Sequence, residues 1–380
     1  GSRDVTFNVG TGADAIIEDV LIQPDGKILA AGRFTTFNGQ PYPHLVRLNE
    51  DGSIDLTFNI GIGFDKHIYA LAMQSDGKII AGGTFLTFKG SSQKRIIRLN
   101  PNGSLDDSFS AGTGFSNGDV RCILVQPDDK LLVGGAFSGT YKNSQALRLI
   151  RLLKTGDFDN SFDARLNKNL LTLSFTNDYR LLIGGDFNSV NGVSKHRAAR
   201  LKLCVDSTIW DGFSWTKGYP SSGKEVFFKE NFPNLISANI CSCTIESAKT
   251  VTLLSGNTLG IEFSYSGLGT LVLEDTASLY QSDDSVVNTG IINLFRKTKP
   301  ILRYDYTFWS SPVDNQKLID VSPNTLFDKY LSFDTAGGWK EEPRLNNMLL
   351  GKGYAIRGPQ EFSITSRAVY EAVFKGIPNN

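Results

Sequence analysis

The chain has 380 residues, and its 39 basic and 39 acidic side chains leave a formal net charge of zero. This balance offers nothing that would attract nucleic acid or an anionic membrane surface, so we expect neither as a partner. The length exceeds what one hydrophobic core usually holds, which favours two or three domains. No apolar run approaches the roughly 18 residues that a membrane-spanning helix needs, so we expect no membrane span.

One motif returns four times in the first 200 residues and indicates a repeat protein. The copies read IQPDGKILAAGRF, MQSDGKIIAGGTF, VQPDDKLLVGGAF and FTNDYRLLIGGDF. Their aspartates, Asp25, Asp76, Asp128 and Asp178, are 51, 52 and 50 residues apart, a period typical of propellers, solenoids and other arrays. Asp-Gly in the first two copies predicts a tight hairpin turn, whereas Asp128-Asp129 and Asp178-Tyr179 predict different or longer turns.

Each of the first three units continues with a second hairpin pattern, as in LVRLNEDGSIDLTF at 45–58, so that a unit holds the four strands of a propeller blade. In these three units an arginine precedes an aspartate by eight residues, which places the two side chains near one another across the turn. We expect one structural ion pair or arginine-to-backbone network per unit; a ring of arginines that binds an anion is the alternative. The pairs are Arg47 and Asp55, Arg98 and Asp106, and Arg151 and Asp159.

The two ends of the repeat region carry the halves of a fourth pair. Arg200 has no aspartate eight residues after it, and Asp4 has no arginine before it. We therefore expect a closed four-unit β-propeller over residues 3–203, in which the strand around Asp4–Phe7 completes the last blade beside the strand of Arg200. A cut through a longer array of repeats would leave the same two halves and is the alternative.

The run QPDGKI at 23–28, its GGxF-like ending, and RLNEDGSIDLTF at 47–58 resemble the delta-60 repeat family. Its β-propeller-like repeats occur in large secreted bacterial proteins, and the resemblance covers residues 4 to about 203. It implies a propeller-like fold. It implies no activity, because the family has no catalytic motif to carry over.

The repeat pattern stops after Cys204, and all four tryptophans of the chain lie beyond it. TVTLLSGNTL at 250–259 and TLVLEDTASL at 270–279 align at an offset of 20 residues, which predicts a short β-solenoid-like segment over 205–293. A sandwich would give similar strands and is the alternative there. Aromatic-rich strands between Pro and Gly turns predict a β-sandwich or jelly roll over 294–380. The predicted fold is therefore all-β: a four-repeat β-propeller, a β-solenoid-like segment and a β-sandwich.

The second half also carries a resemblance. Trp-x-Gly-x-x-Trp at 210–215, the run at 304–312 and Gly-Lys-Gly-Tyr at 351–354 resemble C-terminal regions of large Bacteroidota cell-surface proteins. Many of these are exported by type IX secretion and are similar to adhesins of gliding bacteria. The resemblance implies a secreted, extracellular or cell-surface location, with signal and sorting segments outside this sequence. It implies as partners a surface glycan or protein on another cell or substratum, or the secretion and outer-membrane machinery.

No phosphate-binding loop, nucleophile elbow, HExxH motif or Cys-x-x-Cys pair occurs in the sequence. His44, His67 and His196 lack a partner at metal-ligand spacing and are expected in surface loops or turns. We predict that the protein is not an enzyme, needs no cofactor, and is a non-enzymatic, adhesin-like binding or display module. The alternatives are a glycan-processing enzyme, which would need two facing carboxylates, and a component of the secretion or gliding machinery.

Metal ions and disulfides have weak support. Asp-rich turns at Asp106-Asp107 and Asp283-Asp284 could hold calcium, but neither matches the spacing of a calcium loop. Four cysteines are few for a disulfide framework in a chain of this size, so small buried thiols are expected. A bridge between Cys241 and Cys243, two residues apart on one strand, would be strained.

Exposed aromatic rings could bind the faces of sugars, which makes aromatic residues of the second half the candidate glycan-binding residues. Ordinary core packing is the alternative for each of them. The candidates are Trp210, Trp215, Trp309, Trp339 and Tyr354.

Overall fold

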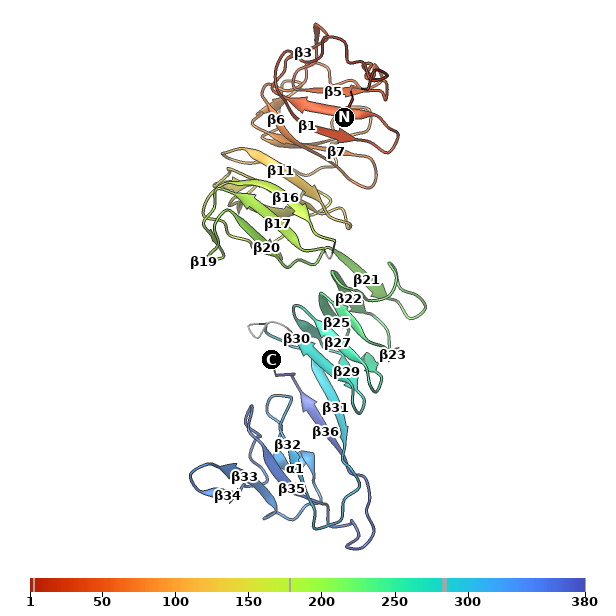
Figure 1. The fold of residues 1–380 in the computed structure, drawn as a ribbon, viewed down its shortest axis with the longest axis vertical. Coiled ribbons are helices and arrows are strands. Elements are labelled where there is room, and N and C mark those ends of the chain that lie inside the picture. The colour runs from red at the N-terminus through yellow and green to blue at the C-terminus, as the bar shows by residue number, and fades with distance from the viewer. Residues whose placement is uncertain (3, 178, 282–285, 380) are drawn as a thin grey trace. The chain divides into compact units, whose positions relative to one another are not determined.

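The computed structural model describes residues 1–2, 4–177, 179–281 and 286–379. Its regular elements are β-strands and one four-residue helix, α1 (Leu318–Val321), so the protein is all-β as predicted. The chain divides into two compact units, Gly1–Leu203 and Cys204–Asn380 (Figure 1). No helix in the described ranges is long and apolar enough to cross a membrane.

Unit 1 consists of four propeller-like repeats, each built on a three-stranded antiparallel sheet. The first two strands flank the repeated Asp turn, and the third carries the arginine of the second pattern. The sheets are β1 (Ile17–Ile22), β2 (Ile28–Gly32) and β5 (Leu45–Leu48); β6 (Ile68–Met73), β7 (Ile79–Gly83) and β10 (Ile96–Leu99); β11 (Val120–Val125), β12 (Leu131–Gly135) and β15 (Leu149–Leu152); and β16 (Leu170–Phe175), β17 (Leu181–Gly185) and β20 (Ala198–Leu201).

A short hairpin joins the second and third strands of each sheet. Its first strand carries an aromatic or valine residue that is buried in the core of the repeat. The hairpins are β3 (Thr36–Phe37) with β4 (Gln40–Pro41), β8 (Thr87–Phe88) with β9 (Ser91–Ser92), β13 (Thr140–Tyr141) with β14 (Ser144–Gln145), and β18 (Ser189–Val190) with β19 (Val193–Ser194).

The residue after the aspartate has the same conformation in all four turns, so the prediction of different or longer turns in the third and fourth copies is wrong. Gly26 and Gly77 have φ angles of 81° and 80°, and Asp129 and Tyr179 have 64° and 60°. In each turn the amide of this residue donates to the carbonyl three residues earlier. A left-handed Asp costs about 1–2 kcal/mol, which contacts of its side chain can offset. The Asp129 carboxylate accepts from the Ser75 amide and hydroxyl over 2.7 and 2.6 Å.

Successive repeats stack face to face. β1 lies beside β6, β6 beside β11, and β11 beside β16. Leu29 of the first repeat and Leu71 of the second share one buried cluster. Gly82 allows the second repeat to approach the third, because a Cβ there would lie 2.4 Å from Val120 Cγ1.

The N-terminal segment packs on the first repeat, and the predicted closure of the propeller is wrong. Phe7 packs against the buried cluster that contains Phe34, and the Asn8 amide donates to the Asp51 carbonyl over 2.8 Å. β20 is an edge strand of its sheet among the described residues. The first and fourth repeats lie at opposite ends of unit 1 (Figure 1).

The reason lies in the sequence around Asp4. DVTFN at 4–8 matches DLTFN at 55–59, and the Asn59 amide donates to the Asn102 carbonyl of the second repeat over 3.1 Å. Residues 4–8 therefore occupy on the first repeat the place that residues 55–59 occupy on the second. They begin a repeat, so they are not available to complete the last one.

Unit 2 begins with a β-solenoid whose strands form three parallel sheets. The predicted offset of 20 residues is the register of the structure: Thr250 pairs with Thr270, and Thr258 with Ser278. The sheets are β21 (Asp206–Trp210), β22 (Lys224–Phe228), β25 (Ser242–Ile245) and β28 (Tyr265–Gly267); β23 (Phe232–Leu235), β26 (Thr250–Leu253), β29 (Thr270–Leu273) and β31 (Ile291–Lys297); and β24 (Ala238–Ile240), β27 (Thr258–Ile261) and β30 (Ser278–Gln281).

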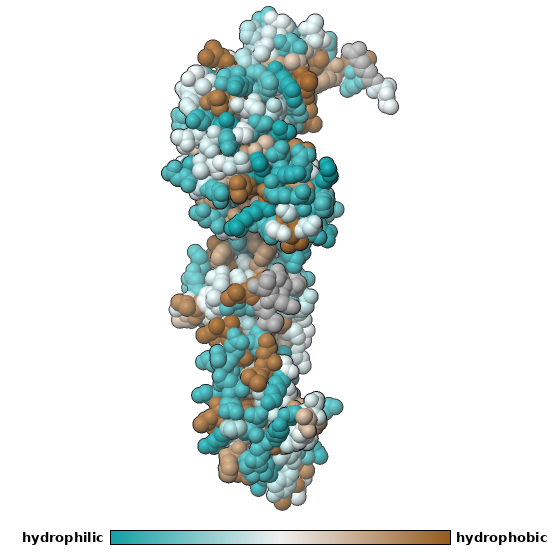
Figure 2. All heavy atoms as spheres, turned by 90° about the vertical axis from the view of Figure 1, so that its left-hand side faces the viewer, coloured by the Kyte–Doolittle hydropathy of each residue, from teal (hydrophilic) through white to brown (hydrophobic). Residues whose placement is uncertain are grey.

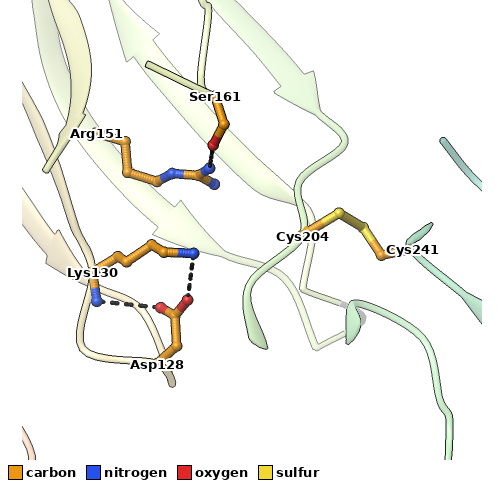
Figure 3. The surroundings of a disulfide bond; sticks show 6 residues. All are labelled: Asp128, Lys130, Arg151, Ser161, Cys204 and Cys241. Atoms are coloured by element: carbon orange, nitrogen blue, oxygen red, sulfur yellow. Dashed lines mark hydrogen bonds and ion pairs between the residues drawn. A yellow bond between two sulfur atoms is a disulfide. The ribbon is translucent and has the colours of Figure 1, made fainter. Parts of the chain in front are cut away.

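Cys204 and Cys241 form a disulfide, with Cα atoms 5.6 Å apart, which corrects the expectation of four buried thiols (Figure 3). The parallel stacking brings them together. The Val205 amide donates to the Gly223 carbonyl over 2.9 Å and the Cys241 amide to the Lys224 carbonyl over 2.8 Å, so both cysteines flank one rung. The other two cysteines, Cys122 and Cys243, are free thiols.

The chain beyond the solenoid returns to it. β36 (Glu371–Gly376) pairs antiparallel with β31, and the chain between them forms a sheet in the order β32 (Tyr306–Trp309), β35 (Tyr354–Arg357), β33 (Tyr330–Asp334) and β34 (Gly338–Glu341). We call this sheet the C-terminal sheet. Tyr330 and Ile356 on its inner face share one core with Phe374 of β36 and Leu253 of the solenoid. The predicted segments 205–293 and 294–380 therefore form a single compact unit.

Candidate functional site

The predicted arginine–aspartate pairs of the first three repeats lie in contact. The Nε atoms of Arg47, Arg98 and Arg151 lie 2.7, 2.6 and 2.8 Å from the Oδ2 atoms of Asp55, Asp106 and Asp159, and all six side chains are buried. Arg47 also donates to the Pro101 carbonyl, and Arg98 to the Lys154 carbonyl, each over 2.6 Å. The two guanidiniums therefore join a repeat to the next one, a structural task.

Electrostatics agrees with that assignment. Burial alone would raise the pKa of Asp55, but hydrogen bonds from Thr57, Lys27 and the charge of Arg47 outweigh it and hold this pKa well below its usual value. Figure 3 shows the third repeat, where Lys130 pairs with Asp128 of its own turn over 2.9 Å.

Asp4 and Arg200 are not brought together, so their predicted pairing is wrong. Asp4 Oδ1 accepts from the amide and the hydroxyl of Thr6 over 2.9 and 2.6 Å. Arg200 is exposed on β20, at the other end of unit 1.

Four of the five aromatic candidates pack in or against the core of unit 2. Trp210 and Trp215 lie 5.5 Å apart, ring centre to ring centre, and pack against the solenoid core. Trp309 packs on Phe374 at 5.8 Å. Tyr354 is 2% exposed, and its hydroxyl accepts from a backbone amide. These four residues stabilise the fold, as the alternative of core packing predicted.

Trp339 is different, because it lies on the outer face of the C-terminal sheet and is 52% exposed. Its ring centre is 6.1 Å from that of Phe308, which is 72% exposed, and 5.4 Å from that of Phe333, which is 55% exposed. We call Phe308, Phe333 and Trp339 the aromatic face. Sequence reasoning identified Trp339 and missed the other two.

The strand register explains how the three rings meet. Phe308 lies opposite Ala355 of the central strand β35, and Phe333 lies opposite Trp339. Side chains alternate along a strand, so Ala355 points away from Tyr354 and Ile356, which are in the core. Ala355 is nevertheless only 3% exposed, because larger neighbours on the outer face cover it. A small central residue thus lets the aromatic side chains of both flanks approach one another.

Polar groups border the aromatic face. Arg357 lies opposite Tyr306 on the same outer face, and its guanidinium carbon is 5.5 Å from the centre of the Tyr304 ring. The Nε atom of Arg357 is buried without a hydrogen-bond partner among the described groups. At the turn before Trp339, the Lys340 ammonium forms an ion pair with Asp334 and lowers the pKa of that carboxyl.

A metal centre has no counterpart in the described residues, where no group of three or more His, Cys, Asp or Glu side chains could hold an ion. Of the two calcium candidates, Asp106 is engaged by Arg98, and Asp283-Asp284 lies outside the described residues. A hollow of about 330 Å³ borders Gln281 and Arg296 in unit 2, and its described lining contains no carboxylate. On the side drawn in Figure 2, hydrophobic residues form separate patches among hydrophilic ones.

Comparison with known proteins matches each unit to a family of unknown function. Residues 205–380 match the family described as "Domain of unknown function (DUF8693)". Residues 23–58, 74–109 and 126–162 match repeats described as "Domain of unknown function (DUF5122) beta-propeller". No curated protein matches the chain.

One solved structure with a similar course is an oxidoreductase (glucose dehydrogenase) from Thermus thermophilus, with 15% identity and a TM-score of 0.32. The match covers 55% of this chain and 67% of that one. The prediction that the protein is not an enzyme is corrected by this finding, because a chain without a catalytic motif in sequence can align with an enzyme. At this TM-score the likeness assigns no activity. By the family matches, the first half of the chain carries DUF5122 β-propeller repeats and the second half is a DUF8693 domain of unknown function.

Proposed function

We propose that the protein is an adhesin-like binding or display module that holds glycans on the aromatic face. The observation that carries the proposal is the trio of Phe308, Phe333 and Trp339, whose rings touch one another while each stays more than half exposed. Contiguous exposed apolar surface is costly in water and marks interaction sites in soluble proteins. A trio of rings on a rigid sheet is such a surface.

The chemistry of the face suits a sugar. The axial C–H groups of a pyranose form a flat apolar surface that can lie on an aromatic ring, and the ring edges carry hydroxyls that need donors and acceptors. Arg357, Lys340 and Asp334 supply such groups at the border of the face. A protein partner could use the same face, and the experiment below distinguishes the two.

The setting of this module is part of the proposal. A disulfide between Cys204 and Cys241 is in keeping with an oxidising compartment, where such bonds persist. The sequence resemblance to Bacteroidota surface proteins supports type IX secretion and a cell-surface location. The repeats of unit 1 would then serve to space or display the binding unit.

The test is a glycan array probed with the full chain, followed by titration of any hit and monitored by tryptophan fluorescence. Trp339→Ala should weaken binding at least about tenfold, since stacking on one ring contributes on the order of 1–1.5 kcal/mol. Tyr280→Ala is the matched control, because Tyr280 is an exposed aromatic of the same unit outside the face. Absence of any glycan hit, or equal affinity of the Trp339→Ala variant, rejects the proposal. Capture of a surface protein that depends on Trp339 would assign the face to that partner class.

A further inference from the structure

The inner repeats of unit 1 each have two covered faces. The second repeat turns Leu71 and Ile79 toward the first repeat and Ile80 toward the third, and all three side chains are buried. We call the side toward the preceding repeat the leading face and the side toward the following repeat the trailing face. The same alternation applies to the strands of every repeat.

The leading face of the first repeat is apolar and uncovered. Val20 and Ile22 hold the positions that Leu71 and Met73 hold in the second repeat, and they are 59% and 71% exposed. The trailing face of the fourth repeat is more polar. It exposes Ser174 on β16, where the second repeat carries the buried Ala72.

This asymmetry has a physical meaning. A stack of repeats buries its core only between neighbours, so a terminal repeat needs a polar outer face to be soluble by itself. The fourth repeat has moved toward such a cap. The first repeat has kept the apolar residues of an inner repeat.

Asp4 repeats the asymmetry in its hydrogen bonds. In the three inner copies the aspartate uses Oδ1 for a Thr or Ser two residues later and Oδ2 for an arginine of the preceding repeat, as Asp55 does with Thr57 and Arg47. Asp4 Oδ1 is bonded to Thr6 in the same way. No contact to Asp4 Oδ2 is made by the described residues, although the atom is positioned for one.

We propose that the leading face of the first repeat is a docking surface for a further repeat of the same type, joined ahead of Asp4 in one polypeptide. That repeat would place aliphatic side chains equivalent to Leu29 on Val20 and Ile22. Its arginine, equivalent to Arg47, would bind Asp4 Oδ2. Continuity with the three existing repeat interfaces supports this occupant, and the polar trailing face of the fourth repeat argues against a second copy of the chain.

The experiment splices a copy of residues 8–54 directly ahead of Asp4 in the full chain, so that the copied Ile54 precedes Asp4 as Ile54 precedes Asp55. Hydrogen exchange of peptides from β1 and β2 and thermal unfolding are then compared with the unmodified chain. Unit 1 should gain roughly 5 °C or more in Tm, because a new repeat interface adds to a stack of nearest-neighbour contacts. Exchange of β1 should slow at least tenfold.

Two variants make the result specific. An extension of equal length whose copied segment carries Leu29→Asp and Arg47→Ala should give none of the gain. Val20→Asp should leave the unmodified chain within about 0.5 kcal/mol, as exposed positions do, and should remove most of the gain from the extended chain. The proposal is overturned if the intact extension stabilises no more than its altered counterpart. It is also overturned if the unmodified chain self-associates in a way that both Asp4→Ala and Arg200→Ala abolish.

Discussion

The Nε atom of Arg98 lies 2.6 Å from Oδ2 of Asp106, with the two side chains only 5% and 8% exposed. The same guanidinium donates to the Gln74 side chain over 2.9 Å and to the carbonyl of Lys154 in the next repeat over 2.6 Å. Its carbon atom lies 4.8 Å from the centre of the Phe109 ring. A single arginine thus satisfies a buried carboxylate and joins two repeats.

Replacing this arginine should be costly. We expect Arg98→Met to lower the free energy of unfolding of unit 1 by about 3 kcal/mol, because it leaves the buried Asp106 with only Lys78 as a charged partner. The equivalent Arg200→Met on the exposed β20 should change it by less than about 0.5 kcal/mol. Hydrogen exchange of the repeat peptides measures both variants, since all four tryptophans lie in unit 2. Equal effects at the two positions would contradict the role assigned to burial.

His44 should make unit 1 less stable at mildly acidic pH. Burial lowers its pKa below the usual 6.5, outweighing the opposing effects of the Gly32 carbonyl, Asp65 and Asp14, while the nearby His67 acts with burial. The unfolded chain therefore binds a proton at a pH where the folded chain does not, and stability falls as the pH drops below about 6.5 toward the lowered value. Above 6.5 the group contributes no pH dependence.

The measurement is the Tm of unit 1 between pH 8 and 5. His44→Gln should flatten the slope, and His196→Gln, a change at an exposed histidine, should leave it as it is. A slope unaltered by His44→Gln would assign the effect to other groups.

Reduction should destabilise unit 2. The disulfide closes a loop of 37 residues, so Cys204→Ser or Cys241→Ser should cost on the order of 2–4 kcal/mol. Alkylation of the unfolded, unreduced protein should modify two thiols, Cys122 and Cys243, and four after reduction. Mass spectrometry of the alkylated peptides checks the pairing, and four modified cysteines without reductant would refute it.

The contact between the second and third repeats leaves no room at Gly82. Gly82→Val should destabilise unit 1 by roughly 1–3 kcal/mol, because its Cβ would lie 2.4 Å from Val120 and 2.8 Å from Ile123. Gly184→Val is the matched change on the trailing face of the last repeat, where the nearest atom is the Cγ2 of the exposed Thr172. We expect it to cost less than half as much in the same unfolding assay. A larger loss at Gly184 would show that the two faces are not distinguished by stacking.

Sequence reasoning succeeded where structure repeats at a fixed interval. The period of unit 1 and the eight-residue spacing of Arg98 and Asp106 predicted strands and contacts, because each depends on a local hairpin. The solenoid was visible only where its rungs have equal length. Glu225 pairs with Ser242 and Thr270 with Ile291, offsets of 17 and 21 residues that hide the outer rungs from a search at 20.

Features that depend on pairing of distant strands could not be predicted. The disulfide needs Cys204 and Cys241 on successive rungs, and no spacing rule in the sequence announces that. The aromatic face needs β32 and β33 on either side of β35, which follows both in the chain. Alternation did place Phe308 with Tyr306 on one side of a strand, a signal for exposure that tryptophan content alone obscured.

The pairing of β31 with β36 has a consequence for how the protein can change. Lys297, the last residue of β31, lies opposite Glu371, the first residue of β36, so the chain leaves the solenoid and returns at neighbouring positions. Everything between them, the aromatic face included, is topologically an insertion into a hairpin. Its loops and outer side chains can diverge while the strand pair stays intact, provided that α1 and the inner face keep filling the common core. The solenoid edge is thereby a natural graft point for new recognition surfaces.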